Sequence, residues 1–341
     1  MPIIKHLFIQ DYGAFVSKHQ GRLRITVKGE RKLDAPIMHL QTLTLADHGV
    51  SISADAIAAC AREGIPVFIV DSRGDPVASL YASALIGTVK TRRAQLLAYA
   101  DRRGFEVARA LALGKIRNQA TLLKYVAKYR KDKDPELYQA LRDAAIDALS
   151  HEQELLALDA DTVSEVREQI LSTEGRAAKA YWAGVKRLIP ADLNWPGRQG
   201  RHAKDPINMA LNYGYGVLYN EVERAIVLAG LDPYAGFLHT DRPGKPSLVL
   251  DLIEPFRAPV VDRTILAMVG KGTSLDLDKR SNLDKTTRAL IAEKVHARLD
   301  APERYKGQRL SPRAIIQTQA RELASYLRGD ADAFQAFQAS W

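Results

Sequence analysis

The strongest constraint in this sequence is a change of periodicity near residue 89. Before it, short runs rich in β-branched and aromatic residues are separated by Gly, Asp and Lys-Gly turns, as expected for half-buried strands. These runs are LFIQ, AFVS, RLRITVKG, MHLQTLTLA, VFIVD and VASLYAS. One helix, SADAIAACAREG, interrupts them, with Ser53 as its N-cap and Gly64 as its stop.

After residue 89 the apolar residues recur with helical spacing nearly to the end of the chain. Asp205 followed by Pro206 marks the start of one long helix, and Gly230 marks its end. The sequence therefore predicts an α+β protein. A small β-rich N-terminal domain at residues 1–88 precedes a larger all-α domain at residues 89–341.

Composition narrows the function. A chain of 341 residues with 46% hydrophobic residues can bury a substantial core. The formal net charge of +9 favours an acidic partner, with nucleic acid as the leading candidate. The single cysteine, Cys60, excludes an intramolecular disulfide and a cysteine-rich zinc site, and its apolar context AIAACA predicts a core filler. No signal peptide and no apolar run of about 18 residues is present, so we expect a cytoplasmic protein with no membrane span.

Several enzyme classes lack their signatures here. The chain has no GxxxxGK phosphate loop, no GxGxxG after a strand, no HExxH and no GxSxG. An NTPase, a dinucleotide enzyme, a zinc protease and an α/β-hydrolase are accordingly disfavoured.

Acidic residues stand instead in apolar settings. Glu174 lies in the apolar stripe of its helix, among Ile170, Ala177 and Ala178. Asp251 and Glu254 interrupt the run SLVLDLIE, twelve or more residues after a histidine, His239. Buried carboxylates need a positive or hydrogen-bonding partner. Two interpretations remain open at this point: ion pairs with Arg or Lys from other helices, or a hard divalent ion such as Mg²⁺ or Mn²⁺ held by the carboxylates and the imidazole.

Three longer motifs resemble a known family. They are EGRAAKAYW at residues 174–182, DPINMALNYGYGVLYNEVERAIVLAGLDPYAGFLH at 205–239, and SLVLDLIEPFRAPVVDR at 247–263. Weaker matches occur at GKIRNQ (114–119) and REGIPVFIVDSRGDP (62–76). In order and spacing the chain resembles the CRISPR-associated endonuclease-integrase of the spacer-acquisition module.

That resemblance implies a homodimer with a β-rich N-terminal domain and a helical catalytic domain that binds metal and DNA. It implies assembly with the small companion protein of the module. The family's metal ligands and catalytic residues fall on Glu174, His239 and Glu254. The implied cofactor is Mg²⁺ or Mn²⁺. The implied reaction is attack of the 3′-hydroxyl of a DNA duplex, the spacer precursor, on a phosphodiester at the end of a CRISPR repeat, with hydrolysis when water attacks instead.

Further residues are candidates for supporting roles near this site. Asp251 matches a further acidic position near it, Tyr181 lies seven residues after Glu174, and Arg257 either holds the scissile phosphate or pairs with an acidic side chain. The loop NWPGRQGRHAK offers Arg198, Arg201 and Lys204 for contacts to DNA phosphates, or forms a solvated surface loop. Two other functions remain open: a nuclease acting on branched DNA in repair, and a non-catalytic DNA-binding scaffold.

Overall fold

The computed structural model describes residues 4–46, 48–82, 88–200, 203–239 and 243–341. The chain folds into two compact units, one formed by Met1–Ile86 with Leu277–Thr286 and the other by Gly87–Asp276 with Thr287–Trp341. The sequence placed all of residues 89–341 in one helical domain. Residues 277–286 belong to the first unit because Lys285 pairs with Asp11 and its carbonyl accepts a hydrogen bond from Gln10.

The first unit contains two four-stranded sheets. One has the order β1 (His6–Ile9), β5 (Thr42–Ala46), β7 (Val67–Val70) and β8 (Pro76–Leu80), with β8 antiparallel to β7 and the other pairs parallel. The other has the order β4 (Glu30–Pro36), β3 (Arg22–Val27), β2 (Ala14–His19) and β6 (Ser51–Ile52). These strands confirm the runs expected from the sequence, except that β4 and the short β6 were missed and that Met38 and His39 belong to a 3₁₀ turn, Ile37–His39, rather than to a strand.

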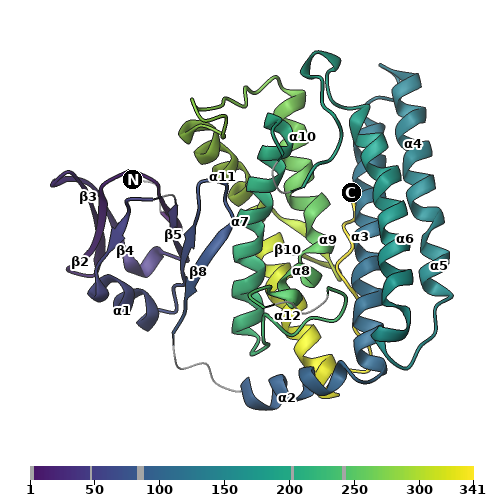
Figure 1. Ribbon diagram of the computed structural model, residues 1–341, viewed down its shortest axis with the longest axis horizontal. Coiled ribbons are helices and arrows are strands. Elements are labelled where there is room, and N and C mark those ends of the chain that lie inside the picture. The colour runs from purple at the N-terminus through teal and green to yellow at the C-terminus, as the bar shows by residue number, and fades with distance from the viewer. Residues whose placement is uncertain (1–3, 47, 83–87, 201–202, 240–242) are drawn as a thin grey trace. The chain divides into compact units, whose positions relative to one another are not determined.

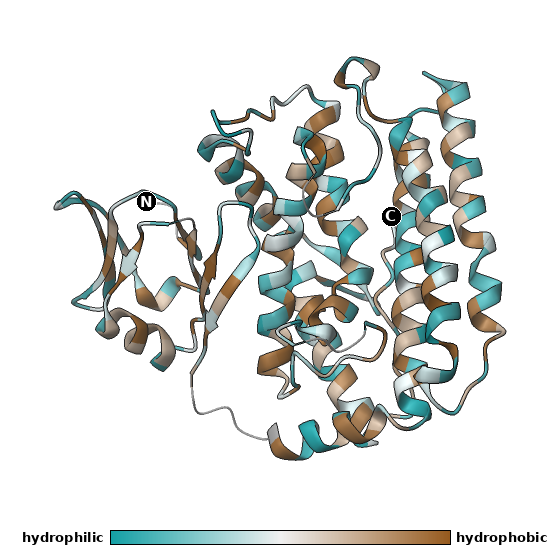
Figure 2. Cartoon of the chain, viewed as in Figure 1, coloured by the Kyte–Doolittle hydropathy of each residue, from teal (hydrophilic) through white to brown (hydrophobic). Residues whose placement is uncertain are grey.

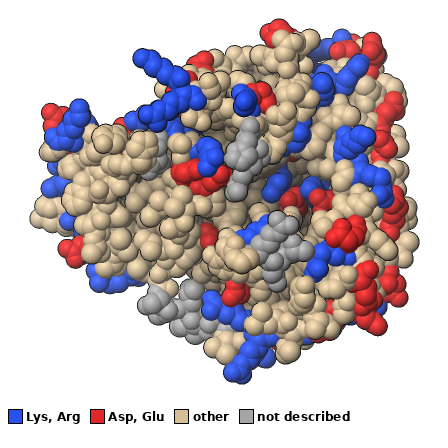
Figure 3. Space-filling view, in the orientation of Figure 1, with Lys and Arg blue, Asp and Glu red and all other residues tan. Residues whose placement is uncertain are grey.

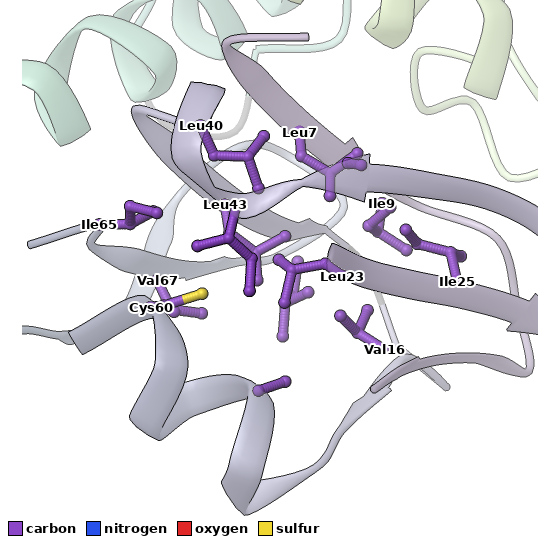
Figure 4. Packing of buried hydrophobic residues seen from close by; sticks show 14 of the residues in the cluster. Leu7, Ile9, Val16, Leu23, Ile25, Leu40, Leu43, Cys60, Ile65 and Val67 are labelled. Carbon is purple, nitrogen blue, oxygen red and sulfur yellow. The ribbon is translucent and has the colours of Figure 1, made fainter. Parts of the chain in front are cut away.

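Side chains from both sheets and from α1 (Ala54–Arg62) form one core in this unit (Figure 4). Leu23, Leu43 and Cys60 are completely buried in it. The α1 helix begins as expected, since the Ser53 hydroxyl accepts a hydrogen bond from Ala56 N at 3.2 Å, and Gly64 follows its end with φ +66°. Burial raises the pKa of the Cys60 thiol to about 11, which agrees with a packing role for this side chain.

The second unit is mostly helical (Figure 1). Its helices are α2 (Thr88–Ala98), α3 (Arg102–Lys128), α4 (Pro135–Ser150), α5 (Glu152–Leu156), α6 (Val163–Lys186), α7 (Pro206–Leu228), α8 (Ser247–Leu252), α9 (Glu254–Phe256), a π-helical turn (Arg257–Asp262), α10 (Arg263–Gly270), α11 (Lys285–Asp300), which starts in the first unit, and α12 (Pro312–Arg328). The α3, α4 and α6 helices pack side by side, and their hydrophobic residues alternate with polar ones along each helix, as Figure 2 shows. A short 3₁₀ turn, Ala191–Leu193, follows α6. The α7 helix begins at Pro206 with Asp205 as its N-cap, as predicted.

One small sheet interrupts the helices of this unit. Strands β9 (Glu303–Tyr305) and β10 (Gln308–Leu310) form an antiparallel hairpin that the sequence analysis did not predict. Both residues of its turn, Lys306 and Gly307, have positive φ angles of 46° and 79°, the conformation that a two-residue hairpin requires. No helix among the described residues is long and apolar enough to cross a membrane.

The segment after α12 has no regular secondary structure but is firmly packed. Phe334 and Phe337 are buried, and the Phe337 ring stacks on Phe256 with centroids 5.0 Å apart and an interplanar angle of 9°. Because Phe256 follows Glu254 by two residues, this C-terminal segment lies directly against the turn that carries one of the predicted ligands.

Candidate functional site

A buried carboxylate organises the loop that ends at His239. Asp251, on α8, is completely buried and accepts hydrogen bonds from three successive backbone N–H groups, those of Phe237 (2.6 Å), Leu238 (3.0 Å) and His239 (2.9 Å). The loop comes so close to α8 that a Cβ on Gly236 would lie 2.9 Å from Asp251 Oδ2 and 2.6 Å from Ser247 Cβ. Only glycine fits there without a shift of the loop or the helix.

Asp251 also fixes the imidazole of His239. The Oδ1 atom of Asp251 lies 2.7 Å from His239 Nδ1. A carboxylate oxygen facing Nδ1 favours the tautomer with its proton on Nδ1, and in that neutral tautomer Nε2 carries the lone pair that can bind a metal. Such carboxylate–imidazole pairs orient histidines that bind metals. Asp251 is therefore placed to position His239, with its own oxygens already engaged.

The same loop is held from its other side by α2. Gln95, which is 1% exposed, donates from Nε2 to the carbonyls of Asp232 (2.9 Å) and Ala235 (2.7 Å) and accepts from Asp232 N (2.8 Å). No sequence pattern indicates this role, since Gln95 lies more than a hundred residues before the loop. Together, Gln95 and Asp251 fix the path of the backbone up to His239.

Glu174 and Glu254 are brought together by a lysine. Lys115, on α3, forms ion pairs with Glu174 on α6 and with Glu254 at the start of α9, the second at 2.7 Å. All three side chains are at most 14% exposed. Sequence reasoning did not assign this partner, although Lys115 stands in the GKIRNQ match. The interpretation of ion pairing with a cation from another helix is therefore correct for both carboxylates in this structure.

A second cation lies on the other side of Glu254. Arg257 Nη2 is 3.3 Å from Glu254 Oε1, so this arginine pairs with an acidic side chain, one of the two roles expected for it. Burial alone would raise the pKa of Glu254, but the charges of Arg257 and Lys115 outweigh it and lower that pKa to about 2. Glu254 is thus ionised at any physiological pH.

The turn that carries Glu254 depends on a side chain from α3. The carbonyl of Pro255 has no partner four residues later, because residue 259 is also proline and has no N–H. Asn118 supplies the missing donor, with Nδ2 2.6 Å from Pro255 O. The same amide binds the C-terminal segment through Phe337 O (2.9 Å) and Ala339 N (2.8 Å). The backbone at Glu254 is therefore tied to both α3 and the C-terminal segment.

Tyr181 belongs to a buried network beside the site. It is completely buried, and its hydroxyl donates to Asp262 Oδ2 at 2.7 Å rather than to one of the predicted ligands. Tyr215 donates to the other oxygen of Asp262. Burial raises the pKa of Asp262 against the lowering effect of these hydrogen bonds. The Arg257 guanidinium lies over the Tyr215 ring, 4.8 Å from its centroid, and this contact links the network to Glu254.

The basic loop before α7 contributes differently from expectation. Arg198 donates to Asn208 Oδ1 (3.2 Å) and Asn212 Oδ1 (2.7 Å) and lies over the rings of Trp182 and Tyr215. Its guanidinium thus holds the loop to α7. Lys204 is exposed, as a side chain in contact with DNA phosphates would be, whereas Arg201 lies outside the described residues.

The three predicted ligands are of the kind that binds a hard divalent ion, although their donor atoms are too far apart in this structure to coordinate one together. They are the carboxylates of Glu174 and Glu254 and the Nε2 atom of His239. Glu174 Oε2 is buried and has no hydrogen-bond partner among the described residues. The three donor groups do not all lie within 4.8 Å of one another, and Lys115 pairs with both carboxylates. On the face shown in Figure 3, a recess in the helical unit exposes both basic and acidic side chains.

Comparison with known proteins gives consistent matches over nearly the whole chain. Residues 7–328 match the family model described as CRISPR associated protein Cas1. The chain is 35% identical over 346 residues to the CRISPR-associated endonuclease Cas1 1 of Archaeoglobus fulgidus, which covers 98% of this chain and 99% of that protein.

Solved structures agree in fold. A casposase bound to its integration product superposes with a TM-score of 0.81 at 23% identity, covering 97% of this chain and 93% of the casposase. A chain of a Cas6-RT-Cas1–Cas2 complex superposes with a TM-score of 0.76 at 18% identity, covering all of this chain and 37% of that chain. These two similarities extend the match from sequence to three-dimensional architecture.

Proposed function

This chain belongs to the Cas1 family of CRISPR-associated proteins, and on that basis we propose that it is a metal-dependent DNA integrase that inserts new spacers into a CRISPR array. The family includes proteins named as endonucleases, and the casposase of similar fold was solved with an integration product, which supports the broader class of CRISPR-associated nuclease or integrase. The observation that supports the proposal is the pair of nearly buried carboxylates, Glu174 and Glu254, that meet at Lys115. His239, oriented by Asp251, is near enough for its charge to lower the pKa of Glu254.

In the proposed reaction, the 3′-hydroxyl of a spacer precursor attacks a phosphodiester at the end of a repeat and joins the two strands by transesterification. Glu174, Glu254 and His239 would hold Mg²⁺ or Mn²⁺. When bound, such an ion polarises a phosphate oxygen and lowers the pKa of the attacking hydroxyl. Phosphoryl transfer requires charge stabilisation and alignment more than a covalent enzyme intermediate.

The protein's own residues supply positioning and charge. Asp251 keeps the proton on His239 Nδ1, so that Nε2 stays available as a ligand. The Arg257 side chain is 29% exposed, and its buried Nε has no hydrogen-bond partner in the part of the chain that the structure describes. A guanidinium donates two parallel hydrogen bonds to a phosphate, so we assign Arg257 to neutralise the phosphodiester under attack.

The proposal includes three partners. They are double-stranded DNA, a second copy of this chain, and the small companion protein of the acquisition module. The superposition on a chain of a Cas1–Cas2 complex supports the companion, and the net charge of +9 supports DNA. Lys204 is the exposed basic residue of the loop before α7 that we assign to phosphate contact.

The test is a joining assay with purified protein, companion, a duplex with free 3′-hydroxyls and a supercoiled repeat plasmid, in Mn²⁺ or in EDTA. We expect joining in Mn²⁺ alone, and its loss in Glu174→Ala, His239→Ala and Glu254→Ala variants that still bind DNA. Joining that survives these changes would contradict the metal site. Cleavage of branched DNA without joining would instead indicate a repair nuclease, and DNA binding with neither reaction would indicate a scaffold.

A further inference from the structure

Lys115 lies between two of the three proposed metal ligands, and the proposed reaction gives it no role. Its ammonium pairs with Glu174 and Glu254, two carboxylates from helices that are distant in sequence. Its position on α3 is well fixed. A Cβ on the preceding residue, Gly114, would lie 2.7 Å from Ala336 Cβ and 3.2 Å from Pro255 Cγ, so α3 packs tightly against the turn that carries Glu254.

The formal charges of this cluster already cancel without a metal ion. Glu174 and Glu254 contribute two negative charges, and Lys115 and Arg257 contribute two positive ones. Asp251 is satisfied separately by backbone N–H groups and His239. A divalent ion would therefore bring two further positive charges into a buried, balanced site, next to an ammonium. Such repulsion is strong at contact distance when water is excluded.

Of the two cations, Lys115 is the one that can move. Arg257 is held by the face of Tyr215 as well as by Glu254. The ammonium of Lys115 stands on a flexible four-carbon stem, and its described contacts are those with the two carboxylates. A phosphodiester entering the site supplies the negative charge that the ion lacks and offers the ammonium a new partner.

We propose that Lys115 is an internal counter-cation that makes metal binding depend on DNA. Without DNA it neutralises Glu174 and Glu254 and opposes entry of the ion. With a DNA phosphate present, the ammonium transfers from the carboxylates to the phosphate and the ion takes its place. This inference rests on the proposed function, and it adds that metal and DNA bind cooperatively, each tightening the other by the same factor.

The experiment measures Mn²⁺ binding directly, from the electron paramagnetic resonance signal of free Mn²⁺, and does not depend on activity. The ligand pair is Mn²⁺ and a blunt DNA duplex with 3′-dideoxy ends, which cannot be joined. For the unaltered protein we expect the duplex to tighten Mn²⁺ binding by about tenfold or more. An affinity that the duplex leaves unchanged would overturn the proposal without any variant.

Lys115→Met is the informative substitution, because it keeps the apolar stem and removes the charge. We expect it to bind Mn²⁺ without DNA about tenfold more tightly than the unaltered protein, and to lose most of the effect of the duplex. Lys115→Arg, which keeps the charge, should retain that effect. If Lys115→Met binds Mn²⁺ no better than the unaltered protein, the lysine is only a structural ion pair and the inference is wrong.

Two controls separate this inference from the proposed function and from a folding defect. Lys115→Met leaves two carboxylates facing each other, so its thermal midpoint should fall without metal and rise more on adding Mn²⁺ than that of the unaltered protein. His239→Ala should abolish Mn²⁺ binding. Binding that depends on His239 but not on Lys115 would overturn only the role of Lys115. Absence of Mn²⁺ binding under every condition would overturn both proposals.

Discussion

The carboxylate of Asp251 holds both the backbone and the ring of His239, since its Oδ1 accepts from His239 N at 2.9 Å and lies 2.7 Å from His239 Nδ1. This double attachment couples the path of the loop to the orientation of the imidazole. The loop and the ligand are therefore expected to respond together to substitutions around Asp251.

Asp251→Asn should weaken Mn²⁺ binding by about 10- to 100-fold, because the carboxylate that orients a metal-binding histidine is lost. The amide would also turn a donor toward backbone N–H groups, which should lower the free energy of unfolding by about 2 kcal/mol or more. Mn²⁺ titration and urea unfolding measure the two effects. A loss of stability with unchanged Mn²⁺ affinity would show that Asp251 supports the loop alone.

Gly236→Ala should disturb the same loop by steric overlap, since the added Cβ would meet Ser247 Cβ at 2.6 Å. We expect a destabilisation of about 1 to 3 kcal/mol and reduced strand joining. Gly175→Ala is the matched control: a Cβ at this position on α6 would meet nothing within 4 Å, so that variant should be more stable by about 0.5 to 1 kcal/mol. Equal thermal midpoints for the two variants would contradict the close approach of loop and helix.

Asn118→Leu and Gln319→Met distinguish two effects of the C-terminal segment. Both side chains bind that segment, Gln319 through Phe337 N (2.7 Å) and Gln335 O (3.0 Å), but only Asn118 also binds Pro255 O. Each variant leaves buried backbone groups unpaired and should lose about 2 to 4 kcal/mol of stability. Only Asn118→Leu should also weaken Mn²⁺ binding, because it frees the turn at Glu254. The same Mn²⁺ affinity in both variants would mean that the segment stabilises the fold without positioning Glu254.

Cys60 should resist thiol reagents in the folded protein and react fully in denaturant. Burial raises its pKa from 9.0 to about 11, and the thiolate is the reactive form. Because burial disfavours the thiolate, ionisation of Cys60 opposes folding. Its contribution to the free energy of unfolding is fully present below pH 9 and is lost as the pH rises toward 11. Labelling with a chromogenic disulfide at pH 8 measures the reactivity of the thiol. Urea midpoints of the unaltered protein and of Cys60→Ala between pH 8 and 11 measure the pH dependence of stability. Rapid labelling without denaturant would show that the N-terminal core opens easily.

Local sequence patterns were sufficient to predict most elements of the fold. Strand β3 alternates exposed and buried residues, and α1 and α7 begin at the side-chain caps Ser53 and Asp205. Strand β4 escaped detection because ERKLDAP, at the edge of its sheet, begins with three exposed charged residues and lacks the alternation of a half-buried strand. Its remaining charged residue, Asp34, is nearly buried and pairs with Arg24 and Arg31. The β9–β10 hairpin has strands of only three residues, which are too short to show an alternating pattern.

The site illustrates what sequence reasoning cannot supply. Apolar surroundings identified Glu174, Asp251 and Glu254 as unusual, and the structure buries all three almost completely. Their partners come from elsewhere in the chain: Lys115 is 59 residues from Glu174. Nothing in the spacing of a lysine on α3 indicates which carboxylates it meets, since that depends on helix packing. Arg198 is the opposite case. The sequence suggested a contact to DNA, whereas its guanidinium donates hydrogen bonds to Asn208 and Asn212.

The attachment of Asn118 to Phe337 and Ala339 also has a consequence in time. Phe337 and Ala339 follow Asn118 by 219 and 221 residues. A ribosome that adds about 5 to 20 residues per second therefore makes them at least about ten seconds after Asn118. Once Phe256 has been made, it still lacks the Phe337 ring that stacks on it, and Asn118 Oδ1 still lacks the N–H of Ala339. The turn at Glu254 therefore reaches its final packing only after residues 337–339 have been synthesised, and until then the nascent chain lacks contacts that fix this carboxylate.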